Sequence, residues 1–467
     1  MSSKNVSTNS NSKRTDRRNF LKTGSAVAAA GAVAGSLATP DLSIARSAYA
    51  GGSETVKIGL IGCGGRGTGA AEQAMNTTSS NVELTCMADV FEDRLRGSHN
   101  RNSNMESIGG KVRVNDDAMH IGYDAYKRVL DSDVDLVILT TPPGFRPLHF
   151  EAAIDAGKHV FMEKPVAVDA PGVRRVLKTG ELAREKNLAV AVGLQRRHEP
   201  WYRDTIQQLK DGIIGDLLVS RVYWNGDGVW MKNRQEGWTE LEYQMRNWYY
   251  FNWICGDHIV EQHIHNLDVI NWLMDDYPSV AQGQGGRQVR TGPDSGQIFD
   301  HHIVEYTYPN GHRMISQCRH QPSTWRSVSE HVHGSKGYAS ISSGRIYDLN
   351  GNEIYKAERD RRAPGGHQQE HHDLFADLAN GIIPNEAEYG AKSTMTSIFG
   401  RLATYTGMEL KWEDAINSDV SLCDVDVLTG MDNTPPLEPD ENGKYWVPTP
   451  GAEWDKGEVI DWNPRGR

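Results

Sequence analysis

The chain has 467 residues, of which 38% are hydrophobic and 24% are charged, proportions that are ordinary for a globular protein. This length exceeds what one hydrophobic core normally holds, so we expect two domains. The formal net charge is −11, and no long basic run occurs beyond the N-terminal segment. This charge pattern argues against nucleic acid as a partner.

The first fifty residues have the features of a targeting signal. The paired Arg17 and Arg18 are followed by Phe-Leu-Lys and then by a weakly apolar stretch rich in Ala and Gly. Ala48-Tyr49-Ala50 supplies an A-x-A cleavage site. These parts, in this order, are typical of a twin-arginine export signal. We therefore expect an exported, periplasmic protein that is cleaved after Ala50 and has no membrane span in its mature form.

Apolar strands alternate with helical segments between residues 51 and 170. Apolar runs begin at Thr55 and Asn81, and two more occupy residues 135–143 and 159–165. Strands that are apolar throughout and separated by helices predict a parallel, doubly wound sheet. The fold class is therefore α/β, with a nucleotide-binding Rossmann domain in residues 51–170.

The pattern changes after residue 171. Apolar and polar residues alternate along several segments, and hairpin turn signals occur at residues 309–311 and 349–352. We expect a second α/β domain over residues 171–415, built on a large and mostly antiparallel sheet. A Pro-rich C-terminal extension follows in residues 416–467.

A glycine motif follows the first predicted strand. Gly62, Gly64 and Gly67 form G-x-G-x-x-G where the strand turns into a helix, and Asp89 ends the next strand. The glycines allow a tight turn and a close approach of a pyrophosphate, while the acid binds the ribose. An acid at this position repels a 2′-phosphate, so we expect NAD in preference to NADP. We expect the neighbouring Arg66 to reach a phosphate, and we include Gly65 in the cofactor site.

A second motif is more specific than the glycine turn. The segment "TTPPGFRPLHFEAAIDAGKHVFMEKP" ends in Glu163-Lys164-Pro165, and "GLQRRHEPWY" follows it in the sequence. Together with the glycine turn, these segments resemble the Gfo/Idh/MocA oxidoreductases over roughly residues 56–413. The resemblance implies a Rossmann domain, an open-faced C-terminal sheet, NAD(P) between them, and a homo-oligomer (dimer or tetramer).

The resemblance also implies roles for particular residues. Lys164 lies near the substrate and the nicotinamide, with Pro165 after a cis peptide, and Arg196 lies near the active site. The other positions implied to contact the cofactor are Thr140, Thr141, Pro142, His149 and Glu163.

Residues 258–274 are predicted to form one amphipathic helix. At 100° per residue, Glu261, His265 and Asp268 share a face, whereas His263 lies on the far side. His265 is the candidate general acid/base for a substrate hydroxyl. Glu261 is expected to bind a substrate hydroxyl or to orient His265, and to raise the pKa of His265, while Asp268 is expected to bind substrate. The family usually has Asp where this chain has Glu261.

An unusual insertion occupies residues 225–258. It combines many aromatic residues with Asn, Asp and Arg, a mixture that suits stacking on sugar rings or an interface. We assign Trp253 from this segment to the substrate site. We expect no metal, although paired histidines such as His301 and His302 leave a site assembled across strands open.

Three functions agree with these features. The first is an exported NAD-dependent oxidoreductase acting on CH–OH groups of a sugar, polyol or glycoside, with a tightly held cofactor. The second is an NAD-dependent glycosidase that uses a transient 3-keto intermediate and shows no net redox change. The third is a non-catalytic carbohydrate-binding protein on the same fold.

Overall fold

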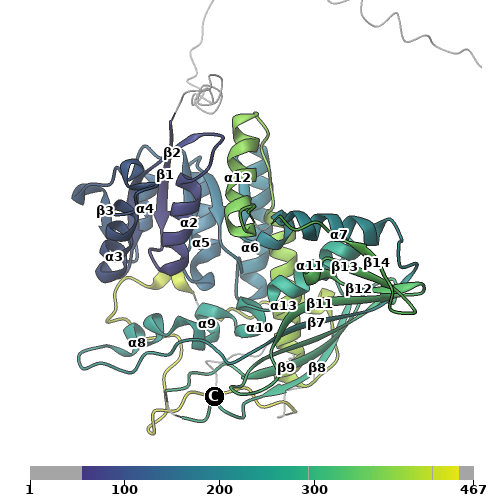
Figure 1. Ribbon diagram of the computed structural model, residues 1–467. Coiled ribbons are helices and arrows are strands. Elements are labelled where there is room, and N and C mark those ends of the chain that lie inside the picture. Colours follow the sequence, from purple (N-terminus) through teal and green to yellow (C-terminus); the bar gives the residue numbers. More distant parts are fainter. Residues whose placement is uncertain (1–54, 293, 361, 423, 452–467) are drawn as a thin grey trace, which may run out of the picture. The chain divides into compact units, whose positions relative to one another are not determined.

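A computed structural model of the protein describes residues 55–451 apart from 293, 361 and 423. The predicted export signal and its cleavage site lie outside these residues. Two sheets with their helices make up most of the described chain (Figure 1).

The first sheet has six parallel strands in the order β3-β2-β1-β4-β5-β6, as a doubly wound fold requires. Strands β4 and β5 are buried along their whole length, which explains their continuous apolar sequence. In chain order, the elements of this part are β1 (Thr55–Ile61), α2 (Gly65–Met75), β2 (Asn81–Asp89), α3 (Glu92–Ser103), β3 (Met119–Ile121), α4 (Ala125–Leu130), β4 (Leu136–Leu139), α5 (Arg146–Asp155), β5 (His159–Met162), α6 (Ala170–Glu185) and β6 (Val190–Val192).

The second sheet has nine strands in the order β14-β13-β12-β11-β7-β10-β9-β8-β15. All neighbours are antiparallel except β7 and β10, so the predicted fold class is confirmed. The strands are β7 (Leu217–Gly226), β8 (Val280–Gly286), β9 (His301–Thr307), β10 (Arg313–His320), β11 (Ser327–Gly334), β12 (Gly337–Ser340), β13 (Arg345–Asp348), β14 (Glu353–Lys356) and β15 (Leu410–Lys411).

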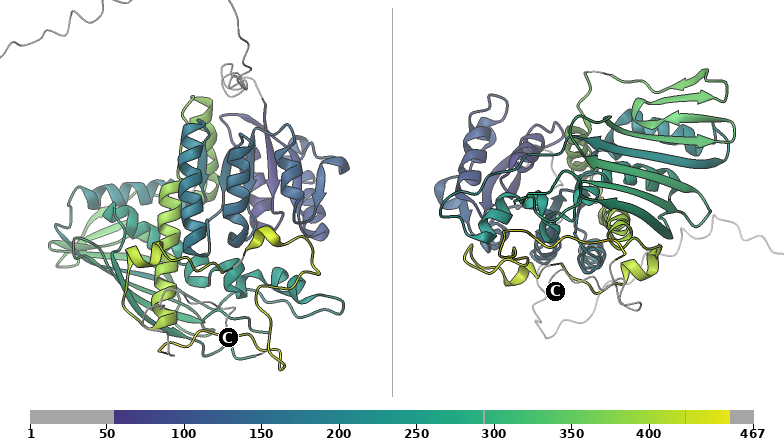
Figure 2. Two further views of the ribbon diagram at one scale, coloured as in Figure 1. Left: turned by 180° about the vertical axis from the view of Figure 1, so that it is seen from behind. Right: turned by 90° about the horizontal axis from the view of Figure 1, so that it is seen from below.

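Helices cover one face of this second sheet and leave the other face open (Figure 2). Helices α11 (Ile264–Met274) and α13 (Ala387–Thr406) lie on the covered face. Ile303 of β9 alternates with the buried His302 and Val304 and is about half exposed. Leu218 and Val328 have the parity of the buried Ser220 and Glu330, so they lie at exposed ends of the covered face. The open face therefore carries the large apolar side chain of Ile303.

Two segments cross the domain boundary predicted at residue 170. Strand β6 completes the first sheet from beyond that boundary, and α12 (Gly366–Ala379) packs against α2. Leu374 and Phe375 of α12 belong to the hydrophobic core of the first domain. In Figure 1, α12 stands to the right of α2. The reason is that α12 buries apolar side chains on a face that the first domain leaves uncovered.

A third hydrophobic core joins the 225–258 insertion to the C-terminal extension. Tyr243 of the insertion packs in one cluster with Leu422 and Leu437 of the extension. Nε2 of Gln244 also donates to the backbone oxygen of Leu437 at 2.6 Å. The extension therefore braces the insertion. The remaining helices are α7 (Pro200–Lys210), α8 (Glu240–Arg246), α9 (Asn252–Cys255), α10 (His258–Glu261) and α14 (Trp412–Ile416).

None of the helices in the described part of the chain has the length and apolar character needed to cross a membrane.

Candidate active site

The glycine turn forms an open cradle at the end of β1. Gly62 has φ +97, and a Cβ there would meet the backbone nitrogen of Thr141 at 2.5 Å. A Cβ on Gly67 would lie 2.0 Å from the backbone oxygen of Gly62, so this glycine allows α2 to approach the strand. Gly64 and Gly65 face open space, since a Cβ on either would have no neighbouring atom within 4 Å. Such a turn at a helix N-terminus fits the phosphates of a dinucleotide.

Asp89 is held beside this turn by two backbone donors. Its Oδ2 accepts from the nitrogen of Cys63 at 2.6 Å and its Oδ1 from the nitrogen of Phe91 at 2.8 Å. Burial raises the pKa of Asp89, although these two hydrogen bonds act in the opposite direction. The carboxylate is thereby fixed where a ribose would lie in a Rossmann fold.

One cavity of about 750 Å³ runs from the glycine turn to the interrupted helix of the second domain. All the predicted cofactor residues and all three predicted catalytic residues line it. They are Gly62, Gly64, Gly65, Arg66, Gly67, Asp89, Thr140, Thr141, Pro142, His149, Glu163, Lys164, Glu261 and His265.

Lys164 connects the two domains within this cavity. Its Nζ donates to the backbone oxygen of Glu261 at 2.6 Å and to the carboxylate of Glu261 at 2.9 Å. Both side chains are mostly buried, at 13% and 14% exposure. The peptide bond from Lys164 to Pro165 is cis, as the family resemblance predicts. The arrangement places an ammonium group between the two domains.

The predicted helix over 258–274 is interrupted, which corrects the sequence prediction. Helix α10 ends at Glu261 and α11 begins at Ile264. The nitrogen of His265 donates to Gln262 at 3.4 Å, instead of to Glu261 four residues back. The backbone oxygen of Glu261 is therefore released from the helical pattern and accepts from Lys164.

His265 lies in a buried position, stacked on Trp224 with ring centroids 6.0 Å apart and ring planes at 22°. Burial holds its pKa well below the ordinary value, and the positive charges of Lys164 and Arg196 lower it further. The expectation that Glu261 raises this pKa was wrong, because burial and cationic neighbours dominate. The imidazole is consequently neutral and able to accept a hydrogen bond, while the lowered pKa makes it a weak base in the absence of substrate.

Arg66 does not take the role predicted for it. Its guanidinium donates to the carboxylate of Glu163, to Glu370 at 3.1 Å and to Gln73 at 2.7 Å. Glu370 comes from α12, a helix that the sequence did not place against the glycine turn. Two carboxylates already engage this guanidinium, so it is a poor phosphate ligand.

Two of the predicted substrate residues are engaged elsewhere. Arg196 forms a buried ion pair with Glu330. Asp268 pairs with Arg197 at 2.8 Å and is 1% exposed. Neither lines the cavity. The physical reason is that each buried charge needs an opposite charge, and the second domain supplies it away from the cavity.

Trp253 is likewise a core residue and not a substrate ligand. It is 2% exposed and belongs to the third hydrophobic core. Its indole nitrogen donates to Oε1 of Gln244 at 2.8 Å, so the single polar atom of its side chain is satisfied internally.

The structure adds cavity residues that the sequence reasoning did not single out. Trp224 and Gln262 line the cavity beside His265, and His367 reaches it from α12. Three cations and two aromatic side chains also line the cavity, all from the insertion except Arg94, which comes from α3. These are Arg94, Lys232, Arg246, Trp230 and Trp248. The mixture of aromatic and basic residues in the insertion was the available signal, whereas nothing in the sequence indicated His367.

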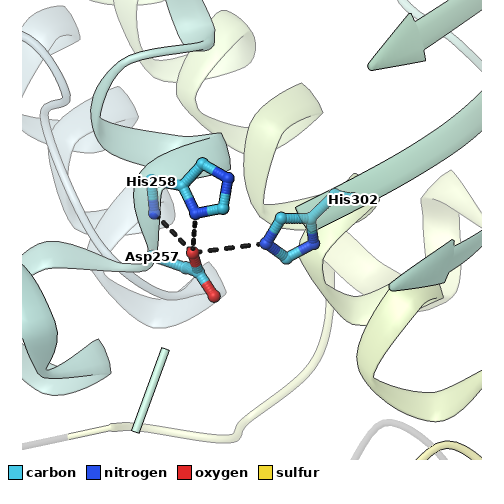
Figure 3. Close-up of side chains that lie close together, drawn as sticks. All are labelled: Asp257, His258 and His302. Carbon is cyan, nitrogen blue, oxygen red and sulfur yellow. Dashed lines mark hydrogen bonds and ion pairs between the residues drawn. The ribbon is translucent and has the colours of Figure 1, made fainter. Parts of the chain in front are cut away.

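A buried polar cluster anchors the start of α10 (Figure 3). Oδ1 of Asp257 lies 2.8 Å from Nδ1 of His258 and 3.2 Å from Nε2 of His302. Oδ2 of Asp257 accepts from the nitrogen of Phe299 at 3.0 Å and from the hydroxyl of Tyr405. These contacts hold Asp257 at φ 81, which is uncommon for a residue with a side chain.

The same cluster contains ligand types that bind zinc, and their ligand atoms lie within 4.8 Å of one another. The sequence did not predict this group, since His302 comes from β9, far from α10 in the chain. Contacts with protein groups already account for the position of Asp257. We therefore describe the cluster as the anchor of the helix that carries Glu261.

Two family models match consecutive parts of the chain. Residues 56–194 match "Oxidoreductase family, NAD-binding Rossmann fold". Residues 206–389 match "Oxidoreductase family, C-terminal alpha/beta domain". The chain belongs to the Gfo/Idh/MocA oxidoreductase family. The family's first domain binds NAD, which agrees with the glycine cradle and with the predicted cofactor.

Individual relatives within the family are distant. Inositol 2-dehydrogenase of Acidothermus cellulolyticus is 27% identical over 241 residues, which cover 51% of this chain and 60% of that protein. Inositol 2-dehydrogenase of Rhizobium meliloti is 24% identical over 340 residues, 72% of this chain and 87% of that protein. The chain therefore spans only about 60% of the length of the first of these relatives.

Solved structures share the fold. Apo scyllo-inositol dehydrogenase from Lactobacillus casei has a TM-score of 0.59 at 20% identity, covering 77% of this chain and 98% of that one. Levoglucosan dehydrogenase in complex with NADH and levoglucosan has a TM-score of 0.60 at 15% identity, covering 77% and 99%. At such identities the likeness establishes the family fold alone.

Proposed function

We propose that this protein is an NAD-dependent oxidoreductase that oxidises a hydroxyl group of a sugar, polyol or glycoside. One observation carries the proposal: Lys164, Glu261 and His265 line the same cavity as the glycine turn that fits a dinucleotide. Relatives named as inositol and levoglucosan dehydrogenases support a cyclic, polyhydroxylated substrate.

Lys164, Glu261 and His265 have separate roles in the oxidation of the substrate hydroxyl. Bound NAD supplies the hydride acceptor. His265, kept neutral by burial, accepts the proton of the hydroxyl group. The ammonium group of Lys164 stabilises the negative charge that develops on the substrate oxygen. Glu261 holds Lys164 in place through its carboxylate and its backbone oxygen.

A redox-neutral glycosidase is the alternative that uses the same residues. Oxidation to a 3-keto sugar with reduction of NAD acidifies the neighbouring C–H bond, elimination then breaks the glycosidic bond, and water adds back. The keto group is then reduced again by the NADH formed in the first step, so that no net redox change occurs. Product analysis separates the two functions, because the glycosidase releases free sugar without accumulating NADH. A non-catalytic binding protein is disfavoured by the convergence of a base, a cation and a carboxylate in one cavity.

Export by the twin-arginine route forms part of the proposal, and it rests on residues 13–50 of the sequence. An exported enzyme cannot easily exchange NAD with a cytoplasmic pool, which favours a tightly held cofactor. Fusing residues 1–50 to a reporter and replacing Arg17 and Arg18 by Lys tests the route. Reporter export that survives this replacement would contradict it.

We also propose a homo-oligomer formed through the open face of the second sheet. Ile303 of β9 exposes about half of its surface on that face, and an interface between two copies would cover it. Light scattering of the wild type and of an Ile303→Glu variant tests it. The variant is expected to be monomeric, and an unchanged mass would contradict this interface.

The oxidoreductase proposal is tested in two steps. Protein purified without added cofactor is denatured, and the supernatant is assayed for NAD. The folded protein is then mixed with free hexoses, inositols and glycosides while NADH absorbance and released sugar are followed. His265→Ala is expected to retain NAD and lose turnover. A His265→Ala variant with wild-type turnover would overturn the assignment.

A further inference from the structure

A second cavity adjoins the candidate active site. Its volume is about 330 Å³, and it shares two lining residues, Trp224 and Gln262, with the larger cavity. Trp224 lies near the end of β7, between the two cavities. His265 stacks on it, with the ring centroids 6.0 Å apart. The two spaces therefore meet at the side chains next to the candidate base.

The chemistry of the smaller cavity differs from that of the larger one. Its walls are the ends of β7 and β10 and the start of β11. Lys164, Glu261 and His265 do not line it, and neither does any residue of the glycine turn. A group bound there consequently lies outside the reach of the hydride transfer. It is held but not oxidised.

The lining suits a neutral sugar ring. Trp224 forms an aromatic part of the wall, and its ring also contacts His265 and the guanidinium of Arg196, which lies 5.8 Å from the ring centre. Gln262 and His320 supply polar side chains on the same side of the sheet as Trp224. Such a mixture of one aromatic wall and several polar groups is typical of a small-molecule site.

The charges at the rim cancel one another. Asp227 and Arg326 form an ion pair at 2.9 Å, with side chains that are 43% and 70% exposed. His320 is buried, and its Nε2 faces Oε1 of Gln262 at 2.7 Å. Burial holds the pKa of His320 well below the ordinary value, so this ring is neutral. The site therefore favours hydroxyl groups over a carboxylate or a phosphate.

We propose that the smaller cavity is a second sugar subsite, which binds the residue attached to the ring that is oxidised. This deepens the proposed function and rests on it. The substrate is accordingly a glycoside or oligosaccharide of neutral sugars, and a free monosaccharide or cyclitol fills only the larger cavity. Trp224 and Gln262 contact the linkage region between the two rings.

Matched substrates test the proposal. Glucose, galactose and mannose are each compared with their disaccharides, and turnover is read as NADH and as released sugar. We expect the glycosides to exceed the free sugars in kcat/KM by about tenfold or more, since an added subsite contributes binding energy. Equal kcat/KM for free sugars and glycosides would overturn the subsite while leaving the proposed function intact.

Variants confined to the smaller cavity sharpen the comparison. Arg326→Ala removes a polar group at the rim, and Val328→Trp fills the space from an exposed position. Both are expected to lower kcat/KM for glycosides about fivefold and leave free sugars unchanged. Arg313→Ala is the control, because Arg313 pairs with Glu305 at 3.0 Å on the same sheet and lines neither cavity.

The remaining outcomes are also decisive. If the variants lower turnover of both substrate classes equally, the smaller cavity is not a separate subsite. If the wild type binds NAD but turns over neither class, the proposed function fails, and the subsite proposal falls with it. Calorimetric titration with an unreactive, non-sugar aglycone alone separates these cases. If the aglycone binds and Val328→Trp abolishes that binding, the smaller cavity does not require a sugar, and the sugar assignment is overturned.

Discussion

Nζ of Lys164 lies 2.6 Å from the backbone oxygen of Glu261, so a residue of the first domain contacts the second domain where its helix is interrupted. Lys164 closely follows β5, whose end faces the cofactor cavity in a doubly wound sheet. The contact fixes the ammonium group relative to both the cradle and His265. Lys164→Met is expected to retain NAD and lower turnover by about 10²-fold to 10⁴-fold, the range typical of a lost charge-stabilising or proton-transferring group.

NADH formation and product release measure this effect, with thermal unfolding as the check on folding. Lys158→Met is the matched control, because Nζ of Lys158 also donates to backbone oxygens but does not line the cavity. A Lys164→Met protein with wild-type activity would remove Lys164 from the reaction.

Glu261 holds Lys164 through two different atoms, and substitutions distinguish them. Glu261→Gln keeps the backbone contact and the side-chain length but removes the charge, so we expect a loss of about tenfold to a hundredfold in kcat. Glu261→Asp restores the acid that the family usually has but shortens the side chain by one methylene. It is expected to be the more active of the two. If Glu261→Gln is more active than Glu261→Asp, the length of the side chain, and not its charge, is what activity requires.

Asp89 predicts the cofactor preference. Its carboxylate is held beside the turn by the nitrogens of Cys63 and Phe91, where it repels a 2′-phosphate. Asp89→Ser is expected to weaken NAD binding about tenfold and to improve NADP relative to NAD by a larger factor. Fluorescence titration of the apoprotein with both cofactors measures the ratio. An unchanged NADP-to-NAD ratio would show that another group sets the preference.

Local sequence patterns were sufficient to predict the cradle and most of the cavity. Glycines around Gly62, the acid at Asp89 and the Glu-Lys-Pro motif each act within a few residues of a strand end, where backbone geometry follows from the local sequence. Parallel strands then bring these ends to one edge of the sheet. That is why residues far apart in the chain were correctly expected in one cavity.

Predictions that depended on long-range pairing were the ones that failed. Asp268 was predicted to bind substrate because it shares a helical face with His265, but it forms a buried ion pair with Arg197. Arg66 was predicted to bind phosphate, yet Glu370 reaches it from a helix assigned to the other domain. The helix interruption after Glu261 was also missed, since no Gly or Pro marks it in the sequence. Partners of buried charges are decided by tertiary packing, which a periodic pattern does not contain.

Two histidines predict opposite responses of stability to pH. His258 is buried in the cluster with Asp257, and burial lowers its pKa from 6.5 to about 4 despite the adjacent carboxylate. His198 lies 2.8 Å from Asp373 and 3.5 Å from Glu386, which together raise its pKa to about 9, although burial acts against them. A shifted pKa makes the free energy of unfolding depend on pH.

The pH dependence of stability has opposite signs because the folded-state pKa of His258 lies below the unfolded-state pKa of histidine, whereas that of His198 lies above it. Below pH 6.5 the unfolded chain protonates His258, while the folded protein resists protonation until about pH 4. Stability is therefore lost as pH falls through this window, by about 3 kcal/mol for this one imidazole, since a tenfold change in proton affinity is worth about 1.4 kcal/mol. The stability that His198 contributes is fully present below pH 6.5 and is lost as pH rises toward 9.

Urea unfolding midpoints measured between pH 4 and pH 9 test both directions, since those limits are the two shifted pKa values. The wild type is expected to be most stable near the middle of the range and to weaken toward both ends. His198→Gln should flatten the alkaline side alone, because the amide cannot be protonated. An alkaline limb that is unchanged in His198→Gln would show that other groups cause it. An acid limb that does not fall would show that the buried His258 accepts its proton without cost.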